Sequence, residues 1–526
     1  MRAMHITGSA AQLPVAQVVE RPRTVAAQAV LVAALVILPL IYTLVPPLQD
    51  YPNHLARMFA LSSLPGNEVL AHFYQVEWAA IPNLIMDIVV PPLVPVFGVY
   101  LAGRIFIGLT LLLMLLGPMA LQRALYGRWS AWPLFGGIFL YNGFLFVGLM
   151  NYLFGVGAAV FGLAAWIGLS DRNPILRGLV SLAFCAVLYT CHLSALGLYG
   201  LSIASFEAWR LWDRKQWRPS ILAASAVTVG APFLPFLYLL VTSPTWGLSH
   251  DFSWQAQGKL DALTMMVSVY SDLTDIPLLL MLATALWFGI HRKLIRIHPA
   301  GVVVAVVLSL AFLAMPRLAF GSWMADQRLV VGIFLMTLGF VSVDLRKLEY
   351  NHAFFAICLV SVAFRVVDVS VNWSAIAQPL LELRNSIRAM PQGSRLLVVD
   401  ADVTDSAVAI EAAMSHAPNL AVIERSALVS RLFVVPGKQI LRAREGARAH
   451  VDNEDGDTPT ISRVMASSDG PAPSGPAYWD NWLDTYDYMI VLGTDPNESA
   501  NPDPDLLRMI HNGREFQLFK IVKPKS

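Results

Sequence analysis

The chain has 526 residues, of which 56% are hydrophobic and 14% are charged, and 37 basic against 36 acidic side chains give a formal net charge of +1. The apolar residues gather in blocks of about 20, long enough to cross a bilayer as helices, which excludes an ordinary water-soluble protein. The balanced charge provides no field that would attract a nucleic acid, so we expect no nucleic-acid partner.

The N-terminal segment predicts an uncleaved signal anchor. Residues 1–24 are polar and end in Arg21 and Arg23, directly before an apolar run over residues 25–45. Basic residues ahead of a first span favour a cytoplasmic N-terminus, and no small-residue cleavage site follows the run. We therefore expect residues 1–24 to be a cytoplasmic segment.

Ten further apolar blocks predict a polytopic α-helical membrane protein with about eleven transmembrane helices. These blocks cover residues 84–103, 105–122, 132–149, 151–170, 175–206, 220–242, 276–290, 299–315, 329–343 and 353–373. Alternating them places the basic connections at 210–218, 291–298 and 346–347 on the cytoplasmic side, together with the N-terminus.

Four arginines disagree with this count. It places Arg123, Arg128, Arg172 and Arg177 on the outer side, where the positive-inside rule disfavours them. Merging or splitting a span within residues 84–122 corrects these four but misplaces the later loops.

The predicted membrane module covers residues 25–374 and leaves outward segments at 46–83, 243–275 and 316–328. The first of these is long for a helix connection, and long loops are often functional. We see no internal repeat of the kind that marks many transporters.

The tail, residues 375–526, predicts a soluble α/β domain on the outer face of the membrane. Its charge density is ordinary, and four short runs have a strand-like composition: "RLLVVD", "LAVIE", "YMIVLG" and "FQLFKIV". Residues 452–476 are rich in Asp, Ser, Pro and Gly and predict a mobile loop within this domain.

The stretch "PPLQDYPNHLARMFAL", residues 46–61, holds the first candidate site. A helix that begins at Asp50 places Asn53, His54 and Arg57 on one face. A carboxylate at the membrane boundary suits proton abstraction from a hydroxyl group or binding of a divalent cation. Asp followed closely by Pro is equally an ordinary helix start, with Asp50 as the N-cap.

The other two outward loops supply cations and aromatic side chains. Arg317 and Arg328 are placed to bind an anion, although snorkelling at the membrane edge, with Asp326 paired to Arg328, explains them too. His250 and Asp251 are candidates for binding an acceptor or a metal ion, next to Trp residues that either stack on a sugar or anchor the interface.

Two ionisable residues, Asp87 and His192, lie within predicted spans, and we interpret both as satisfied packing groups. The chain lacks the P-loop, H-E-x-x-H and G-x-S-x-G motifs, which removes support for nucleotide-driven transport and for the common hydrolase mechanisms.

In layout the first 340 or so residues resemble the GT-C superfamily of membrane glycosyltransferases. The resemblance rests on a first span with its N-terminus inside, an outward loop that opens with Asp50 and a helix, and an outward loop after the seventh span. Short motifs accompany it: "FG" at residues 97–98, "AGRIF", "RALYGRW" and "NYLFG".

The resemblance implies that Asp50 is the catalytic or metal-binding carboxylate, and that the substrate is a sugar carried on a polyprenyl phosphate. We therefore expect inverting transfer to an acceptor hydroxyl of a glycan or lipid, in cell-envelope glycan or glycolipid assembly. His54, Arg57, His250, Asp251, Arg317 and Arg328 are the candidate substrate-binding residues. Many GT-C members have adjacent Asp and Glu in the first loop, and this chain does not, so a Mg²⁺ or Mn²⁺ cofactor at Asp50 stays open.

Three other functions fit parts of the pattern. A ligase or polymerase of lipid-linked oligosaccharides also uses outward Arg and His residues. A transporter or flippase requires ionisable groups near the bilayer midplane, whereas here the polar groups gather at one face. A non-catalytic scaffold is the third alternative. Few charges and no organelle signal favour the bacterial inner membrane, with the C-terminal domain in the periplasm.

Overall fold

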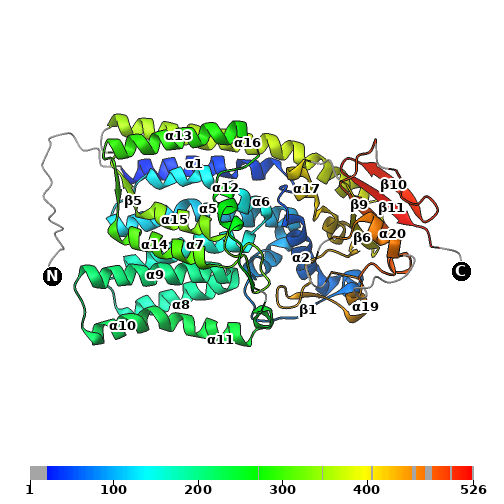
Figure 1. Cartoon of the computed structure of the whole chain (residues 1–526), viewed down its shortest axis with the longest axis horizontal. Helices are drawn as coiled ribbons and strands as arrows, with labels where there is room; N and C mark the ends of the chain where they lie inside the picture. The colour runs from blue at the N-terminus through cyan, green and yellow to red at the C-terminus, as the bar shows by residue number, and fades with distance from the viewer. Residues whose placement is uncertain are drawn as a thin grey trace.

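The computed structural model describes residues 21–523 except 251, 271, 346–347, 404–406, 453–455, 457, 468–476 and 498–499, and it leaves out the side chains of 272–273 and 348–350. A bundle of long helices fills one part of the molecule, and the C-terminal sheet packs against one end of that bundle (Figure 1).

Eleven passages between the two ends of the bundle can be followed in the described residues. They are α1 (Pro22–Tyr42), α4 (Ile85–Val89) with α5 (Val94–Tyr126), η3 (Trp132–Phe139) with α6 (Gly143–Val147), α7 (Met150–Gly168), α8 (Pro174–Cys191), α9 (Leu193–Asp213), α10 (Pro219–Gly230) with α11 (Leu234–Thr242), α13 (Asp272–His291), α14 (Pro299–Ala314), α15 (Leu329–Phe340) and α16 (Leu348–Ile387). Seven helices or helix pairs are long and apolar enough to cross a membrane, and α14 and α15 are shorter apolar helices.

Two predicted span boundaries were wrong, and together the two errors leave the number of spans unchanged. Residues 84–103 and 105–122 form one continuous passage, kinked at Gly98, where φ is +71°. The block 175–206 is instead two helices, α8 and α9, which meet at His192. The extended backbone of His192 breaks the helix there, although the surrounding sequence is apolar throughout.

With these corrected helix boundaries, the basic connections lie at one end of the bundle. The hydroxyl group of Tyr126 donates to the carbonyl of Phe340, and strand β3 (Ile295–Ile297) pairs with β5 (Val341–Val343). Arg214, after α9, contacts Asp171, after α7. Arg123, Arg128, Arg172 and Arg177 therefore lie at the same end as residues 210–218 and 291–298; Arg346 and Lys347 lie outside the described residues.

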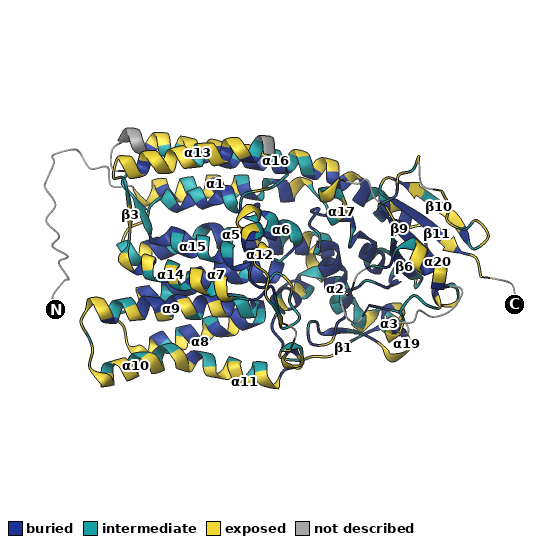
Figure 2. Ribbon diagram, viewed as in Figure 1, coloured by how far each residue is buried: buried dark blue, intermediate teal, exposed yellow. Residues whose placement is uncertain are grey.

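The outer helices of the bundle expose apolar side chains. None of the residues of α10 is buried, and only 6% of the most apolar stretch of α10 and α11 is buried. Figure 2 shows the exposed residues along α8, α10, α11 and α13 and the buried ones between the inner helices. Apolar side chains that face outward on long helices are typical of contact with lipid.

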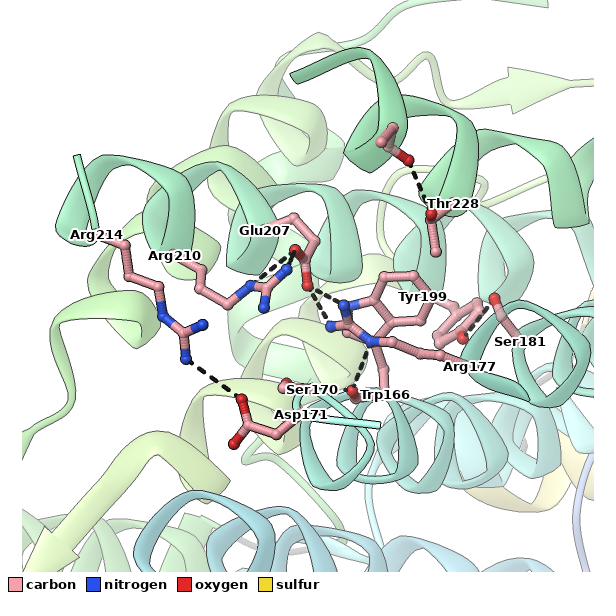
Figure 3. Close-up of polar contacts among 11 residues, drawn as sticks. Trp166, Ser170, Asp171, Arg177, Ser181, Tyr199, Glu207, Arg210, Arg214 and Thr228 are labelled. Carbon is pink, nitrogen blue, oxygen red and sulfur yellow. Dashed lines mark hydrogen bonds and ion pairs between the residues drawn. The ribbon is translucent and has the colours of Figure 1, made fainter. Parts of the chain in front are cut away.

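A buried ionic network joins α7, α8 and α9 near the end that carries the basic connections (Figure 3). The Glu207 carboxylate accepts hydrogen bonds from the Trp166 indole, Arg177 and Arg210, and Arg177 also lies 3.7 Å above the Trp166 ring. Because each charge is paired or hydrogen-bonded, the network tolerates burial and holds the three helices in register.

The C-terminal sheet has five strands in the order β10-β11-β9-β6-β7. The strands are β6 (Arg395–Asp400), β7 (Leu428–Val429), β9 (Tyr488–Leu492), β10 (Leu507–Gly513) and β11 (Phe516–Ile521); β6 pairs in parallel with β7 and β9, and β11 is antiparallel to its neighbours. The shorter helices of this region are α17 (Val408–Met414), η6 (Ala417–Asn419), α18 (Leu420–Arg425), α19 (Glu445–Arg448), α20 (Ile461–Ala466) and α21 (Trp482–Thr485).

Three of the four predicted strands are confirmed, but "LAVIE" is the helix α18. The predicted boundary at residue 375 falls inside α16, which continues to Ile387. Of the predicted loop at 452–476, residues 461–466 form α20, and residues 453–455, 457 and 468–476 lie outside the described part of the chain.

The first outward segment and the C-terminal region pack into one body. Helices α2 (Tyr51–Ser63) and α3 (Glu68–Phe73) lead to β1 (Tyr74–Val76), which pairs antiparallel with β8 (Leu441–Ala443). Helix α2 lies against α5 and α18, and Leu55 and Met58 are fully buried. The apolar side of α2 therefore faces a protein core.

Candidate functional site

Asp50 immediately precedes α2, but its side chain makes no capping hydrogen bond. Its backbone N–H donates to the carbonyl of Val147, the last residue of α6. A Cβ added to Gly148, whose φ is +96°, would lie 2.8 Å from the Cβ of Asp50. The carboxylate is 23% exposed and lies 3.5 Å from Nε2 of His416. The position is that of an N-cap, and the side chain is directed to another partner.

Asn53, on the next turn, binds the C-terminal region. Its Oδ1 accepts the backbone N–H of Phe433 at 2.8 Å, and its Nδ2 donates to the carbonyl of Arg431 at 3.0 Å. The same Nδ2 lies 3.3 Å from Nδ1 of His416. Asn53 thus fixes both a backbone segment of the C-terminal region and an imidazole ring.

His54 is buried and faces the same space as Asp50. Its ring lies edge-on to Phe433, and its Nδ1 has no hydrogen-bond partner among the described residues. Burial, followed by the nearby charges of Arg57 and His416, lowers the pKa of His54 well below its usual value. His54 is therefore neutral at physiological pH, and its ring has one donor nitrogen and one acceptor nitrogen.

Arg57 forms a buried ion pair with Asp87. Its Nε and Nη2 atoms donate to the two carboxylate oxygens at 2.9 and 3.0 Å, and each side chain is 1% exposed. This geometry confirms that Asp87 is a satisfied packing group. It also turns Arg57, a candidate for substrate binding, away from the cavity that Asp50 and His54 line.

Arg328 is buried at the start of α15 and contacts His192. Its Nη1 lies 2.6 Å from Nε2 of His192, and its other nitrogens donate to the carbonyls of Met324 and Trp323. Nδ1 of His192 accepts the backbone N–H of Ser194 and so caps α9. Asp50 lies within electrostatic range of the Arg328 guanidinium.

Arg317 belongs to a separate ionic cluster on the same loop. It lies 3.8 Å from Asp326 and 3.7 Å from Asp261, with its guanidinium above the Trp323 ring. Lys259 pairs with Asp326 at 2.9 Å. Asp326 thus pairs with Lys259 and Arg317, whereas the sequence suggested Arg328. This cluster joins the outward loops 243–275 and 316–328 and does not line the cavity.

The remaining candidates lie on the second outward loop. His250 is exposed and does not line the cavity, and Asp251 lies outside the described residues. The indole of Trp254 donates to the carbonyl of Leu313, which anchors β2 (Phe252–Ser253) beside β4 (Leu318–Ala319). The structure therefore does not bring His250 together with Asp50.

A cavity of about 610 Å³ lies between the bundle and the C-terminal region. Its polar wall includes Asp50, His54, His192, Arg328 and Lys438. Its apolar wall comes from α9, α14 and α15 and contains Leu198, Leu201, Leu308, Ala311, Leu329 and Ile333. One carboxylate, two imidazole rings and two cationic side chains thus share one cavity with a wall of aliphatic side chains.

The donor atoms at Asp50 do not fit a divalent cation. Among the described residues, no group of three or more His, Cys, Asp or Glu side chains is placed to hold a metal ion. Mg²⁺ and Mn²⁺ prefer several oxygen ligands, whereas the near neighbours of Asp50 named above are imidazole and guanidinium groups.

Sequence reasoning missed three residues that line or support the cavity. The sequence predicts a packing group at His192, yet a histidine inside an apolar block is itself a signal of a functional site. His416 and Lys438 belong to the tail and carried no motif. Their proximity to Asp50 depends on how the C-terminal region docks, which a local pattern does not encode.

Comparison with known proteins identifies a fold. No family model and no curated protein sequence matches the chain. Among solved structures, the crystal structure of ArnT from Cupriavidus metallidurans in the apo state is similar, with a TM-score of 0.51 and 13% identity. The match covers 95% of this chain and 99% of that one, including the C-terminal region. The chain therefore has the same overall fold as this ArnT structure, a polytopic helical bundle with a C-terminal domain, and the sequence predicted that architecture.

Proposed function

We propose that the protein transfers a sugar from a polyprenyl phosphate to an acceptor hydroxyl group, with Asp50 as the base. The observation that carries this proposal is that one cavity contains a carboxylate, Asp50, and a buried cationic group, Arg328. Glycosyl transfer needs both, because the attacking hydroxyl loses a proton while the departing phosphate gains negative charge.

The contact between Arg328 and His192 supports an anion site. A neutral imidazole has one acceptor nitrogen, yet the Ser194 N–H and the Arg328 guanidinium each present a donor to this ring. If Nδ1 accepts from Ser194, Nε2 carries the proton and faces another donor. A phosphate oxygen seated against both N–H groups satisfies them together.

The apolar wall suits a lipid carrier. Leu201, Leu308 and Ile333 come from three helices of the membrane bundle and line the same cavity as Arg328. A polyprenyl chain that lies against these side chains remains in an apolar medium while its phosphate reaches the cationic end of the cavity.

The proposed reaction is a single displacement. The acceptor oxygen forms a bond to the anomeric carbon, Asp50 takes the hydroxyl proton, and the bond from the anomeric carbon to the phosphate oxygen breaks. The lipid phosphate leaves with the bonding electron pair, and Arg328 stabilises its charge. One displacement inverts the anomeric configuration.

The fold shared with ArnT is compatible with this chemistry. We infer that the donor is a polyprenyl-phosphate sugar and that the acceptor is a glycan or lipid of the cell envelope.

We also propose that the C-terminal region lies in the bacterial periplasm. With the corrected helix pairing, the basic connections gather at the end opposite the C-terminal sheet. The positive-inside rule assigns such an end to the cytoplasm. Labelling of His511→Cys by a membrane-impermeant thiol reagent in intact cells, in a background with Cys185, Cys191 and Cys358 replaced by Ser, tests this orientation.

The activity is tested with radiolabelled polyprenyl-phosphate sugars in membranes that carry the native protein, Asp50→Asn or Asp171→Asn at equal abundance. Asp171 is an exposed carboxylate at the opposite end of the bundle, so its variant is the control. We expect transfer by the native protein and by Asp171→Asn, and loss of transfer in Asp50→Asn. Native membranes that transfer no sugar from any donor would contradict the proposal and favour a transporter.

A further inference from the structure

The hydrogen bonds of Asn53 determine which ring nitrogen of His416 carries the proton. Oδ1 of Asn53 accepts the Phe433 N–H, and Nδ2 donates to the carbonyl of Arg431, so the amide has one orientation that satisfies both contacts. Nδ2 is therefore the atom that faces Nδ1 of His416, at 3.3 Å. Because an amide nitrogen only donates, Nδ1 of His416 accepts, and a neutral ring carries its proton on Nε2.

That proton faces the carboxylate of Asp50. Nε2 of His416 lies 3.5 Å from Oδ1 of Asp50, a little beyond the usual hydrogen-bonding range, and catalytic contacts are often this long before substrate binds. Asn53, His416 and Asp50 thus form a chain in which each donor faces an acceptor. Asn53 and Asp50 come from the first outward segment, whereas His416 is supplied by the C-terminal region more than 360 residues later.

The surroundings of His416 hold the ring in place. The side chain is 9% exposed, and the ring packs edge-on against Phe433 with a centroid separation of 5.0 Å. Its own carbonyl accepts the backbone N–H and the side-chain amide of Asn419, at 3.1 and 3.2 Å, so the short helix η6 fixes the backbone as well. A buried imidazole held at both ring and backbone is preorganised for one direction of its Nε2–H bond.

We propose that His416 is a positioning residue that orients Asp50 and stabilises its ionised form, so that the C-terminal region is part of the catalytic unit. This inference rests on the proposed role of Asp50 as the base. A hydrogen bond donated to a carboxylate favours the charged form, which is the form that accepts a proton from the acceptor hydroxyl.

The proposal predicts the pH dependence of transfer. The other titratable or charged groups named around this pair are His54, beside His416, Arg328, within electrostatic range of Asp50, and His192 and Lys438, which line the same cavity. All four remain in every variant, so the change in the acid limb reports the loss of the His416 contact. Without the Nε2–H donor the ionised carboxylate is less favoured, and the acid limb of the rate profile shifts to higher pH.

The test measures kcat and KM for a polyprenyl-phosphate sugar between pH 5 and 9 in the full-length protein with His416→Ala, His416→Gln and His511→Ala. Gln places an amide N–H near the position of Nε2, so it replaces the donor. His511 is the matched control, because it forms another histidine–carboxylate pair in the same region, 3.0 Å from Glu382, and does not line the cavity.

We expect His416→Ala to lower kcat about 10- to 100-fold with a small change in donor KM and to move the acid limb up by about one pH unit. His416→Gln is expected to recover most of kcat and the native acid limb, and His511→Ala to match the native protein. If His416→Ala does not fold, the profile of His416→Gln against that of His416→Asn, which is too short to reach Asp50, provides the same comparison.

The inference is overturned if the His416 variants that fold keep the native kcat and acid limb. It is also overturned if Gln and Ala lower kcat equally without moving the limb, since that result indicates a role in docking only. In both cases Asp50→Asn still abolishes transfer, so the proposed function stands. Transfer that survives in Asp50→Asn contradicts the proposed function itself.

Discussion

Arg57 and Asp87 provide a direct test of whether a polar residue of the first outward segment serves structure or catalysis. Both side chains are 1% exposed and share two hydrogen bonds at 2.9 and 3.0 Å. Replacing Arg57 with Met leaves the Asp87 carboxylate buried without its cation, which costs about 3–5 kcal/mol of stability. We therefore expect Arg57→Met to lower the Tm of the purified protein in lipid nanodiscs.

The double variant Arg57→Met with Asp87→Leu removes both charges and is expected to regain most of the lost Tm, because replacing a buried ion pair with apolar side chains is often neutral or stabilising. With Asp87→Leu measured as the second single variant, the mutant cycle is expected to give a coupling energy of about 2 kcal/mol or more. Transfer activity per folded molecule should change less than threefold in both variants. A native Tm for Arg57→Met with a large rise in donor KM would refute this assignment and return Arg57 to the substrate site.

Three further predictions follow from the site and the sheet. Burial raises the pKa of Asp400 from 3.8 to about 6, so the folded state holds this proton more tightly and loses stability as pH rises through that window. Asp400→Asn should therefore raise Tm at pH 7.5, and the gain in the free energy of unfolding should be about 2–3 kcal/mol at most. Below pH 4 the native protein and the variant should have the same stability. A stability difference that stays constant across pH would contradict this prediction. Arg328→Gln should lower kcat about 100- to 1000-fold by removing a donor to the leaving phosphate, and native turnover would show that the phosphate lies elsewhere. Gly148→Ala should lower kcat more than tenfold because its Cβ would displace Asp50, checked by turnover per folded molecule; unchanged turnover would show that the turn yields without moving the carboxylate.

The sequence predicts the membrane architecture well because lipid demands long apolar helices, whatever their packing. Its errors have specific causes. The boundary predicted at Arg104 lies inside α5, six residues after its kink at Gly98, and the helix break at His192 has no adjacent Gly or Pro to mark it. In the tail, β-branched residues make "LAVIE" resemble a strand, yet the segment packs against α2 as a helix.

The candidate site was predictable only where one segment contained it. Asp50 and His54 both line the cavity and lie four residues apart in a recognisable pattern. Arg57 belongs to the same pattern, but its side chain points to Asp87, a partner 30 residues away that periodicity does not reveal. His416 reaches Asp50 through tertiary docking, and such long-range contacts leave no local signal in one sequence.

The central claim is that Asp50 acts as the base in a cavity whose cationic end binds the donor phosphate. The most direct measurement is single-turnover transfer from a saturating polyprenyl-phosphate sugar by the native protein and Asp50→Asn, with donor binding measured on the same samples. The account predicts that Asp50→Asn binds the donor with native affinity and transfers sugar at least about 100-fold more slowly. Native single-turnover rates in Asp50→Asn would show that Asp50 only begins a helix.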